Sequence, residues 1–306
     1  MVQLGYSISS EEHQAQKLVE YAVQAEQIGF TFALISDHYH PWINKQGQSP
    51  FVWSVLGAIA QATTKLRIGT GVTCPIIRIH PAIIAQAAAT VATLMPGRFF
   101  LGVGTGENLN EHITGEKWPP YDTRTKMLEE AVEVIRLLWQ GGSQSYEGQY
   151  YTVENAQVYS LPDELPPIMV AASGEKSGEL AARIGDGLIT TAPDKEVVQN
   201  FKKAKTGKRP MYGQVSVCWA ASEAKAIKTA HEWWPTAGLG GEMTQVLPTP
   251  IHFEQATETV REEDVAKNVI CGNDPKKHLE AIQKFVDLGF DYVYVHQIGP
   301  DQEGFF

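Results

Sequence analysis

Short apolar runs alternate with amphipathic helical stretches from the beginning of the chain. Residues 2–8 form an apolar run that predicts a buried strand, residues 11–28 carry apolar side chains at helical spacing, and residues 30–36 are again continuously apolar. Continuous apolar runs are typical of parallel strands, because helices cover both faces of a parallel sheet. The chain therefore begins with a predicted β-α-β unit.

The same alternation continues to the end of the chain. Further helices are expected over residues 52–62, 81–94, 123–138, 176–184, 197–205, 222–233 and 275–288. The strongest parallel-type strands centre on Leu4, Leu34, Ile68, Leu101, Val170, Ile189, Val217 and Val293. Eight parallel strands are the number that closes a barrel. We therefore expect an α/β protein, a (β/α)8 TIM barrel that forms one domain over residues 1–306.

Two segments depart from this alternation and are expected to be insertions. Residues 146–150 read as a hairpin turn between two short strands. Residues 235–250 are rich in glycine and proline and have no clear period. This second segment predicts a mobile cap over the barrel mouth.

Charge and cysteine content narrow the choice of partners and compartment. The chain has 25 basic and 35 acidic residues, a formal net charge of -10, so it has no long-range attraction for nucleic acid or an anionic membrane. Cys74, Cys218 and Cys271 are far apart and lack metal-ligand spacing, which favours a reducing compartment without disulfides or a bound metal. No apolar stretch approaches the ~20 residues of a membrane span, and no basic leader begins the chain. These features predict a cytoplasmic protein with a small-molecule substrate.

Titratable groups follow the second predicted strand, at the end where barrel enzymes place their reactive residues. His38 has Asp37 beside it and Trp42 four residues on. Together with a carboxylate at another strand end, these residues offer a base, a supporting dipole and an acid. Proton abstraction coupled to hydride transfer requires these three groups. The alternatives are that His38 is a hydrogen-bonded structural residue, that His40 is the base, and that Glu11 only caps the first helix.

A glycine run follows the fourth predicted strand. Gly102, Gly104 and Gly106 do not match the dinucleotide-binding pattern, because the third glycine comes one position too early and the run follows the fourth strand instead of the first. Such glycines permit a backbone to approach a flat ring closely. The alternative is that these glycines form only a tight turn, which caps a helix that has Glu107 and Asn110 at its start.

Four segments in order, residues 36–42, 81–87, 96–98 and 102–111, resemble the deazaflavin-dependent branch of the bacterial-luciferase-like superfamily. The likeness covers nearly the whole chain and is greatest to glucose-6-phosphate dehydrogenase-like and secondary-alcohol dehydrogenase members. It implies a TIM barrel, coenzyme F420, a homodimer and hydride transfer from a CH–OH donor to the C5 carbon of the coenzyme.

The resemblance also implies roles for individual residues. His38 matches the base that takes the substrate hydroxyl proton, and Trp42 matches the group that helps to hold the developing charge. Glu107 matches a group that serves the N1 side of the ring, and Glu11 a carboxylate of the same pocket. A cis peptide that backs the ring would fall at Gly71 and Val72. The other ring-lining positions are Asp37, Cys74 and Asn110. The positions for the phosphate tail are Ala172, Ser173, Gly174, Lys176, Ser177, Thr190 and Thr191, which an ordinary strand-to-helix turn would also explain.

The chain departs from the glucose-6-phosphate dehydrogenases at the residues that hold the sugar phosphate. Asp194, Thr244 and Asn268 stand where those enzymes have two lysines and an arginine, with Lys195 and Lys267 one position away. A dianion would be poorly matched there, which favours a neutral alcohol or a different sugar derivative. Two rival hypotheses are an FMN-dependent monooxygenase of the same superfamily and a non-catalytic carrier of the coenzyme.

Overall fold

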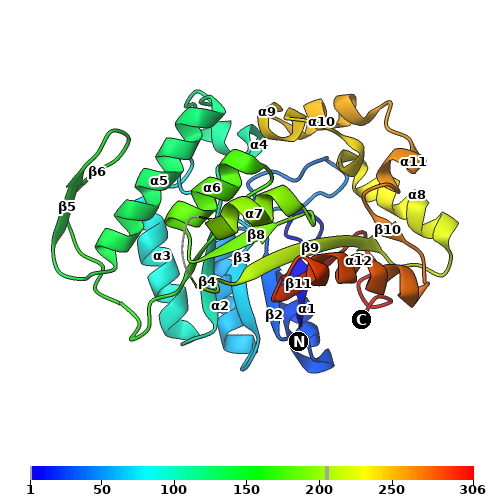
Figure 1. The fold of residues 1–306 in the computed structure, drawn as a ribbon, viewed down its shortest axis with the longest axis horizontal. Helices are drawn as coiled ribbons and strands as arrows, with labels where there is room; N and C mark the ends of the chain where they lie inside the picture. The colour runs from blue at the N-terminus through cyan, green and yellow to red at the C-terminus, as the bar shows by residue number, and fades with distance from the viewer. Residues whose placement is uncertain (1, 204–206) are drawn as a thin grey trace.

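The computed structural model, which describes residues 2–203 and 207–306, contains a closed parallel barrel (Figure 1). Its eight strands pair in the order β9-β11-β1-β2-β3-β4-β7-β8, and β8 pairs again with β9 to close the ring. They are β1 Gln3–Ile8, β2 Phe32–Ile35, β3 Arg67–Thr70, β4 Phe99–Val103, β7 Ile168–Ala171, β8 Gly187–Thr190, β9 Met211–Cys218 and β11 Tyr292–Gln297. Each predicted strand centre lies in one of them, so the predicted barrel is confirmed. A short strand, β10 Ile270–Cys271, pairs with the end of β9.

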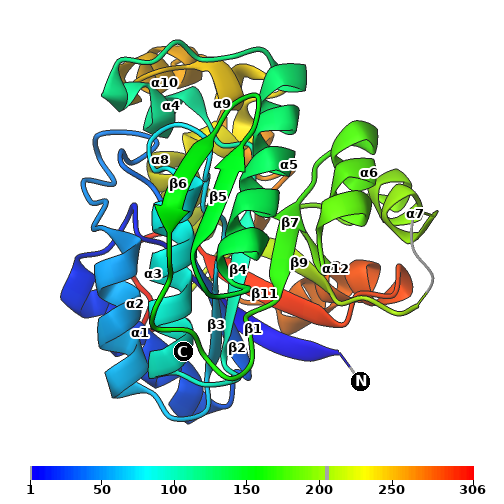
Figure 2. The ribbon, with the colours of Figure 1, turned by 90° about the vertical axis from the view of Figure 1, so that its left-hand side faces the viewer.

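Helices surround the barrel (Figures 1 and 2). They are α1 Ala15–Ile28, α2 Val52–Ala62, α3 Pro81–Leu94, α5 Tyr121–Leu138, α6 Glu175–Ile184, α7 Lys195–Lys203, α8 Glu223–Trp233 and α12 Pro275–Asp287. The largest difference from the prediction is at α1, which begins at Ala15 and not at Glu11. Glu11, Glu12 and His13 are buried, so the residues between β1 and α1 face the interior and do not belong to the helix surface. The predicted end of α7 at Lys205 lies outside the described residues.

The barrel interior is built in layers, because alternate residues of each strand point inward. Large side chains fill its lower part, and these are Phe32, Leu34, Phe100, Met169, Ile189, Tyr212 and Tyr294. Above them, towards the C-terminal ends of the strands, the inward positions of β1, β9 and β11 are polar: Ser7, Gln214, Ser216 and His296. The core therefore changes from apolar to polar where the strands end.

Both predicted insertions have regular structure. β5 Gln144–Glu147 and β6 Thr152–Ala156 form an antiparallel pair, which confirms the hairpin. The segment after α8 holds η2 Pro235–Gly238, α9 Met243–Val246, α10 Pro250–Thr257 and α11 Glu262–Val265. Its residues line the cavity at the barrel mouth, so its position as a cap is as predicted. The glycine- and proline-rich sequence forms short helices, and its mobility stays a prediction.

None of the described helices combines the length and the apolar character that a membrane span needs. The described residues also contain no group of three histidine, cysteine, aspartate or glutamate side chains placed to hold a metal ion.

Candidate active site

A cavity of about 650 Å³ lies at the C-terminal ends of the strands. It receives side chains from both halves of the barrel and from the cap. The predicted site residues that line it are Glu11, His38, Trp42, Gly71, Val72, Glu107, Ala172, Ser173, Ser177, Thr190 and Thr191. Asp37, Cys74, Asn110, Gly174 and Lys176 do not line it. The structure thus brings all four predicted catalytic residues to one cavity.

His38 follows β2 and faces Glu11, which follows β1. The Nε2 atom of His38 lies 3.4 Å from Oε1 of Glu11, and the two side chains are 10% and 4% exposed. The Nδ1 atom lies 3.1 Å from the main-chain oxygen of His40. A protonated Nδ1 that donates to this carbonyl leaves Nε2 as the basic nitrogen on the side of Glu11.

Serine hydroxyls surround the carboxylate of Glu11. Ser36 Oγ donates to Oε2 of Glu11 over 2.5 Å, and Ser9 Oγ donates to the same oxygen over 3.2 Å. Burial acts to raise the pKa of Glu11, but the nearby His38 imidazole and the Ser36 hydrogen bond outweigh it, so the pKa lies below its ordinary value. Glu11 is therefore an ionised partner for His38 and not merely a helix cap.

Trp42 packs beside the histidine. The ring centres of His38 and Trp42 are 5.1 Å apart. Trp42 also packs edge to face against Phe253, a residue of the cap, with the ring centres 5.2 Å apart. The main-chain N–H of Trp42 donates to Oε1 of Gln46 over 2.8 Å. These contacts fix the indole at the wall of the cavity.

Another part of the cavity wall is made largely of backbone. The peptide bond between Gly71 and Val72 is cis, as the resemblance implies. A Cβ atom on Gly104 would come within 2.8 Å of the Val72 side chain, and Gly106 has a φ of +69° with Cys74 directly behind it. Glycine is required at both positions, so backbone atoms together with the Val72 side chain form this wall.

Glu107 stands at the start of the short helix α4 Asn108–Glu111 and lines the cavity. The side-chain amide of Asn110 donates to Oε2 of Glu107 over 3.3 Å. The amide oxygen of Asn110 accepts the main-chain N–H groups of Tyr39 and His40. Asn110 therefore connects the Glu107 segment to the His38 loop from behind the cavity.

A buried ion cluster supports the site from the same side. Arg78 binds Asp37 over 2.9 Å and Glu111 over 3.4 Å, and Thr73 Oγ1 donates to the second oxygen of Asp37. Burial raises the pKa of Glu111 to about 7 although Arg78 opposes the shift. Asp37 is thus part of a structural cluster that lies behind the residues facing the cavity.

The predicted phosphate-binding turn precedes α6. Ser177 Oγ accepts the main-chain N–H groups of Ser173 and Gly174 over 3.1 and 3.0 Å. Lys176 points away from the cavity and pairs with Asp122 at the surface. Thr190 Oγ1 donates to the main-chain oxygen of Ala192. A phosphate at this turn would share these amides with the serine hydroxyl.

The positions of the missing phosphate clasp divide into two groups. Thr244, Asn268 and Lys267 line the cavity, whereas the Asp194 carboxylate accepts two main-chain N–H groups at the start of α7. Lys267 Nζ lies 2.8 Å from a carboxylate oxygen of Asp264.

Several cavity residues were not predicted, among them Ser7, Gln214, Ser216, Trp234 and His296. His296 and Gln214 lie within the last two long strands of the barrel. The rule that chemistry gathers at strand ends would have found His296. Gln214 and Ser216 carry no such signal, because single polar residues in a strand are common on exposed faces.

Comparison with known proteins assigns this barrel to a family. The model of the luciferase-like monooxygenase family matches residues 2–292, and the chain belongs to that family. Among curated relatives, the F420-dependent glucose-6-phosphate dehydrogenases of Microbacterium testaceum and Mycobacterium tuberculosis are 36% and 35% identical to it. Each match covers 99% of this chain and 94% of the relative.

Solved structures show the same relationship. An F420-dependent secondary alcohol dehydrogenase in complex with an F420-acetone adduct matches with a TM-score of 0.92 and 30% identity, over 99% of this chain and 95% of that one. The coenzyme F420 dependent tetrahydromethanopterin reductase from Methanopyrus kandleri matches with a TM-score of 0.80 at 23% identity, over 99% and 95%. This second likeness shows a shared fold.

Proposed function

We propose that this protein is an F420-dependent dehydrogenase that moves hydride between a CH–OH substrate and the C5 carbon of the deazaflavin. One observation supports this most strongly: the imidazole of His38, with the ionised Glu11 beside its Nε2 atom, lines the same cavity as the wall formed by Gly71, Val72 and Gly104. The relatives named above as F420-dependent dehydrogenases, which match along nearly the full chain, support the same choice of coenzyme.

The residues present fit a planar ring. A side chain at Gly104 would collide with Val72 and one at Gly106 would collide with Cys74 behind the wall, so backbone faces the cavity here, and the cavity is large enough for a ring together with a small substrate. Gly71, Val72 and Gly104 would hold the ring face. Ser173, Ser177, Thr190 and Thr191 would hold the tail, with Ala172 beside them. Asp37, Cys74 and Asn110 would support this wall from behind.

When bound, the coenzyme would supply an electrophilic carbon as the acceptor for hydride from the alcohol carbon. His38 Nε2 takes the hydroxyl proton as the hydride leaves, and Glu11 stabilises the imidazolium that forms. Trp42 closes the cavity beside the imidazole and excludes water. Glu107 stands at the edge of the glycine wall, where its carboxyl group can hold or release a proton at the ring.

The substrate we propose is an uncharged alcohol or sugar-type compound. Thr244 and Asn268 offer a hydroxyl and an amide to the cavity, and Asp194 is used at the start of α7. Lys267 and Lys284 also line the cavity, but Lys267 pairs with Asp264. Lys284 alone would poorly match a phosphate dianion, which needs several charge-assisted hydrogen bonds.

Equilibrium titration with coenzyme F420 and with FMN tests the coenzyme. The F420-loaded protein is then mixed anaerobically with a panel of alcohols and sugar phosphates, and loss of the visible absorbance of the oxidised coenzyme is followed. We expect F420 to bind and an alcohol to bleach it. Binding of FMN alone with oxygen consumption would favour the monooxygenase, and F420 binding without bleaching would favour a carrier.

A homodimer and a cytoplasmic location complete the proposal. The homodimer follows from the resemblance, and light scattering at several protein concentrations tests it. The location is supported by the three cysteines, which are free and buried. Cell fractionation tests it.

A further inference from the structure

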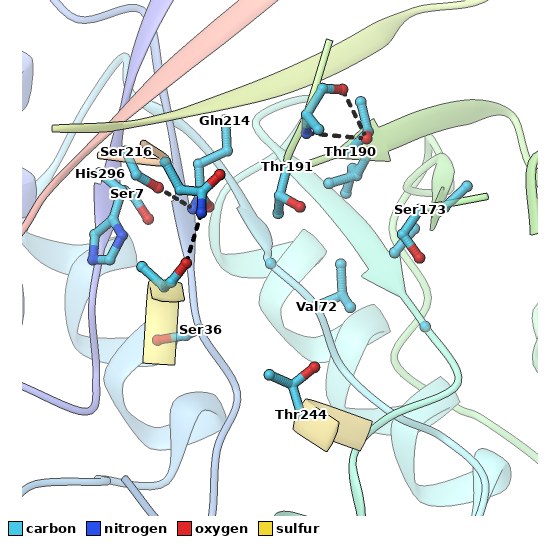
Figure 3. Close-up of a pocket in the computed structure, with 18 of the residues that line it drawn as sticks. Ser7, Ser36, Val72, Ser173, Thr190, Thr191, Gln214, Ser216, Thr244 and His296 are labelled. Atoms are coloured by element: carbon cyan, nitrogen blue, oxygen red, sulfur yellow. Dashed lines mark hydrogen bonds between the residues drawn. The ribbon is translucent and has the colours of Figure 1, made fainter. Parts of the chain in front are cut away.

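One side of the cavity is a polar surface that the proposed chemistry does not use. It consists of Ser7 on β1, Gln214 and Ser216 on β9, and His296 on β11, and we call these four residues the polar floor. Figure 3 shows them gathered together, whereas Ser173, Thr190 and Thr191 lie across the cavity. Within the polar floor, the Gln214 amide donates to Ser216 Oγ over 3.3 Å.

His296 is the residue of the polar floor with the most distinctive surroundings. Its Nε2 atom lies 3.5 Å from Oε2 of Glu12, and the two side chains are 4% and 0% exposed. The other oxygen of Glu12 accepts the main-chain N–H of Gly299 over 2.9 Å. Trp234 of the cap packs its ring against the imidazole at 4.6 Å. The imidazole is therefore held in one orientation at the cavity wall.

Glu12 occupies one ring nitrogen of His296 and leaves the other for a ligand. Nε2 of His296 and Oε2 of Glu12 are both buried and face each other at 3.5 Å, so these two atoms pair with one another and not with a molecule in the cavity. His296 also lines the cavity, so its second ring nitrogen, Nδ1, is the atom that a ligand can reach. Polar atoms at such a position normally have a hydrogen-bond partner, which indicates that a ligand completes the hydrogen bonding of the imidazole.

The His296 pair repeats the arrangement of the His38 pair. Glu11 and Glu12 are consecutive residues, and each carboxylate lies within 3.5 Å of the Nε2 atom of one imidazole of the same cavity. Within the proposed function, His38 is committed to the hydroxyl group that is oxidised. His296 is therefore free to contact a different group of the substrate.

We propose that His296, held by Glu12, binds a second hydroxyl group of the substrate, and that the natural substrate is an uncharged polyhydroxylated compound, a polyol or an unphosphorylated sugar. This inference rests on the proposed function. A substrate with one hydroxyl group would leave the polar floor unpaired, and sites built to bind a hydroxyl discriminate strongly against analogues that lack it. The cavity also contains Lys267, which pairs with Asp264, and Lys284 of α12, and neither is one of the four residues of the polar floor.

The test compares sorbitol and D-glucose with propan-2-ol, in the F420-loaded wild type and in His296→Phe and His296→Gln. We expect kcat/KM for sorbitol or D-glucose to exceed that for propan-2-ol by at least about 100-fold. His296→Phe should lower kcat/KM for the polyhydroxylated substrate by about 10- to 100-fold and should change kcat/KM for propan-2-ol by less than about threefold. His296→Gln should restore part of the loss, because it keeps a polar group.

His13→Phe is the matched control, since His13 is buried, lies close enough to Glu12 to feel its charge, and does not line the cavity. It should leave the ratio of the two kcat/KM values unchanged. Equal losses on both substrates in His296→Phe, or a preference of the wild type for propan-2-ol, would overturn the inference. A weaker affinity for F420 in His296→Phe would also overturn it, because the imidazole would then contact the coenzyme.

Calorimetric titration of the F420-loaded protein with sorbitol and D-glucose separates the inference from the proposed function. Binding that His296→Phe abolishes, without bleaching by any alcohol, would refute the proposed function and support the second-hydroxyl contact. Bleaching by propan-2-ol without binding of either polyhydroxylated probe would support the proposed function and refute the inference.

Discussion

His38 and Glu11 form a buried imidazole-carboxylate pair, with Nε2 of His38 3.4 Å from Oε1 of Glu11. The two residues follow neighbouring strands, β2 and β1, so the barrel wall itself sets their separation. The contact of Nδ1 with the His40 main-chain oxygen fixes which nitrogen faces the carboxylate. In the proposed mechanism, His38 takes up the alcohol proton, and the Glu11 carboxylate balances the positive charge that the imidazole then gains.

Replacing the base should remove catalysis and leave coenzyme binding intact. We expect His38→Ala to lower kcat by about 100- to 10,000-fold, because positioned general bases contribute this much. The affinity for F420 should change by less than about threefold. Stopped-flow bleaching measures kcat, and fluorescence titration measures the affinity. His40→Gln is the control, since His40 does not line the cavity. Equal loss of rate and affinity in His38→Ala would count against the assigned role.

The Glu11 carboxylate should contribute a pH-dependent part of the stability. Its pKa in the folded protein lies below the ordinary value of 4.5, so the folded state favours the ionised form. The resulting stabilisation is fully present above pH 4.5 and is lost as the pH falls through the lowered pKa. Urea unfolding on the acid side should therefore show a smaller loss of stability in Glu11→Gln than in the wild type. Identical pH profiles would contradict this.

Glu111 should have the opposite pH dependence. Burial raises its pKa to about 7, so its contribution to stability is fully present below the ordinary value of 4.5 and is lost as the pH rises through 7. We expect Glu111→Gln to gain stability relative to the wild type between pH 5 and pH 8 in urea unfolding. A constant difference across this range would show that Glu111 stays ionised beside Arg78.

The wall at Gly104 should tolerate no added side chain. In Gly104→Ala the added Cβ would lie 2.8 Å from the Val72 side chain, so the wall must shift and the affinity for F420 should fall at least about tenfold. Gly57→Ala in α2 is the matched control, because its Cβ would meet nothing within 4 Å. That change should leave the affinity unaltered and stabilise the helix by about 0.5–1 kcal/mol. Equal F420 affinity in both variants would show that the ring does not lie against this wall.

Restoring cations at the clasp positions should change substrate preference. We expect Thr244→Lys with Asn268→Arg to raise kcat/KM for glucose 6-phosphate at least about tenfold, because both positions line the cavity and each charge-assisted hydrogen bond is worth roughly 1.5–3 kcal/mol. Steady-state rates with glucose 6-phosphate and D-glucose measure the shift. No gain in the double variant would indicate that the phosphate of such a substrate would lie elsewhere.

The barrel could be predicted because each strand and helix carries its own periodic signal. Short apolar runs between amphipathic stretches marked all eight strands of the barrel, and helices α2 and α3 have the predicted bounds. The start of α1 was misplaced because Glu11 and Glu12 fit a helical pattern but are held in the interior by His38 and His296. The prediction that residues 1–306 form one domain stays a prediction.

Site residues could be predicted where they directly follow a strand. His38, Trp42 and Glu107 follow strands and were recognisable, whereas the contact between Glu12 and His296 joins residues from opposite ends of the chain. The sequence also did not indicate which residues are buried behind the cavity wall. Asp37, Cys74 and Asn110 were expected to face the ring, but they do not line the cavity. Whether a side chain faces the cavity or lies behind its wall depends on contacts with neighbouring strands, which the sequence does not give.

Transfer of deuterium from propan-2-ol labelled at C2 tests the proposed hydride transfer most directly. The F420-loaded protein is mixed anaerobically with the labelled alcohol in ordinary water, and the reduced coenzyme is analysed by mass spectrometry and NMR. Direct transfer beside His38 should place one deuterium at C5 of the coenzyme, with none lost to solvent. Reduced coenzyme that carries only solvent hydrogen at C5, or no reduction by this or any other alcohol, would contradict it.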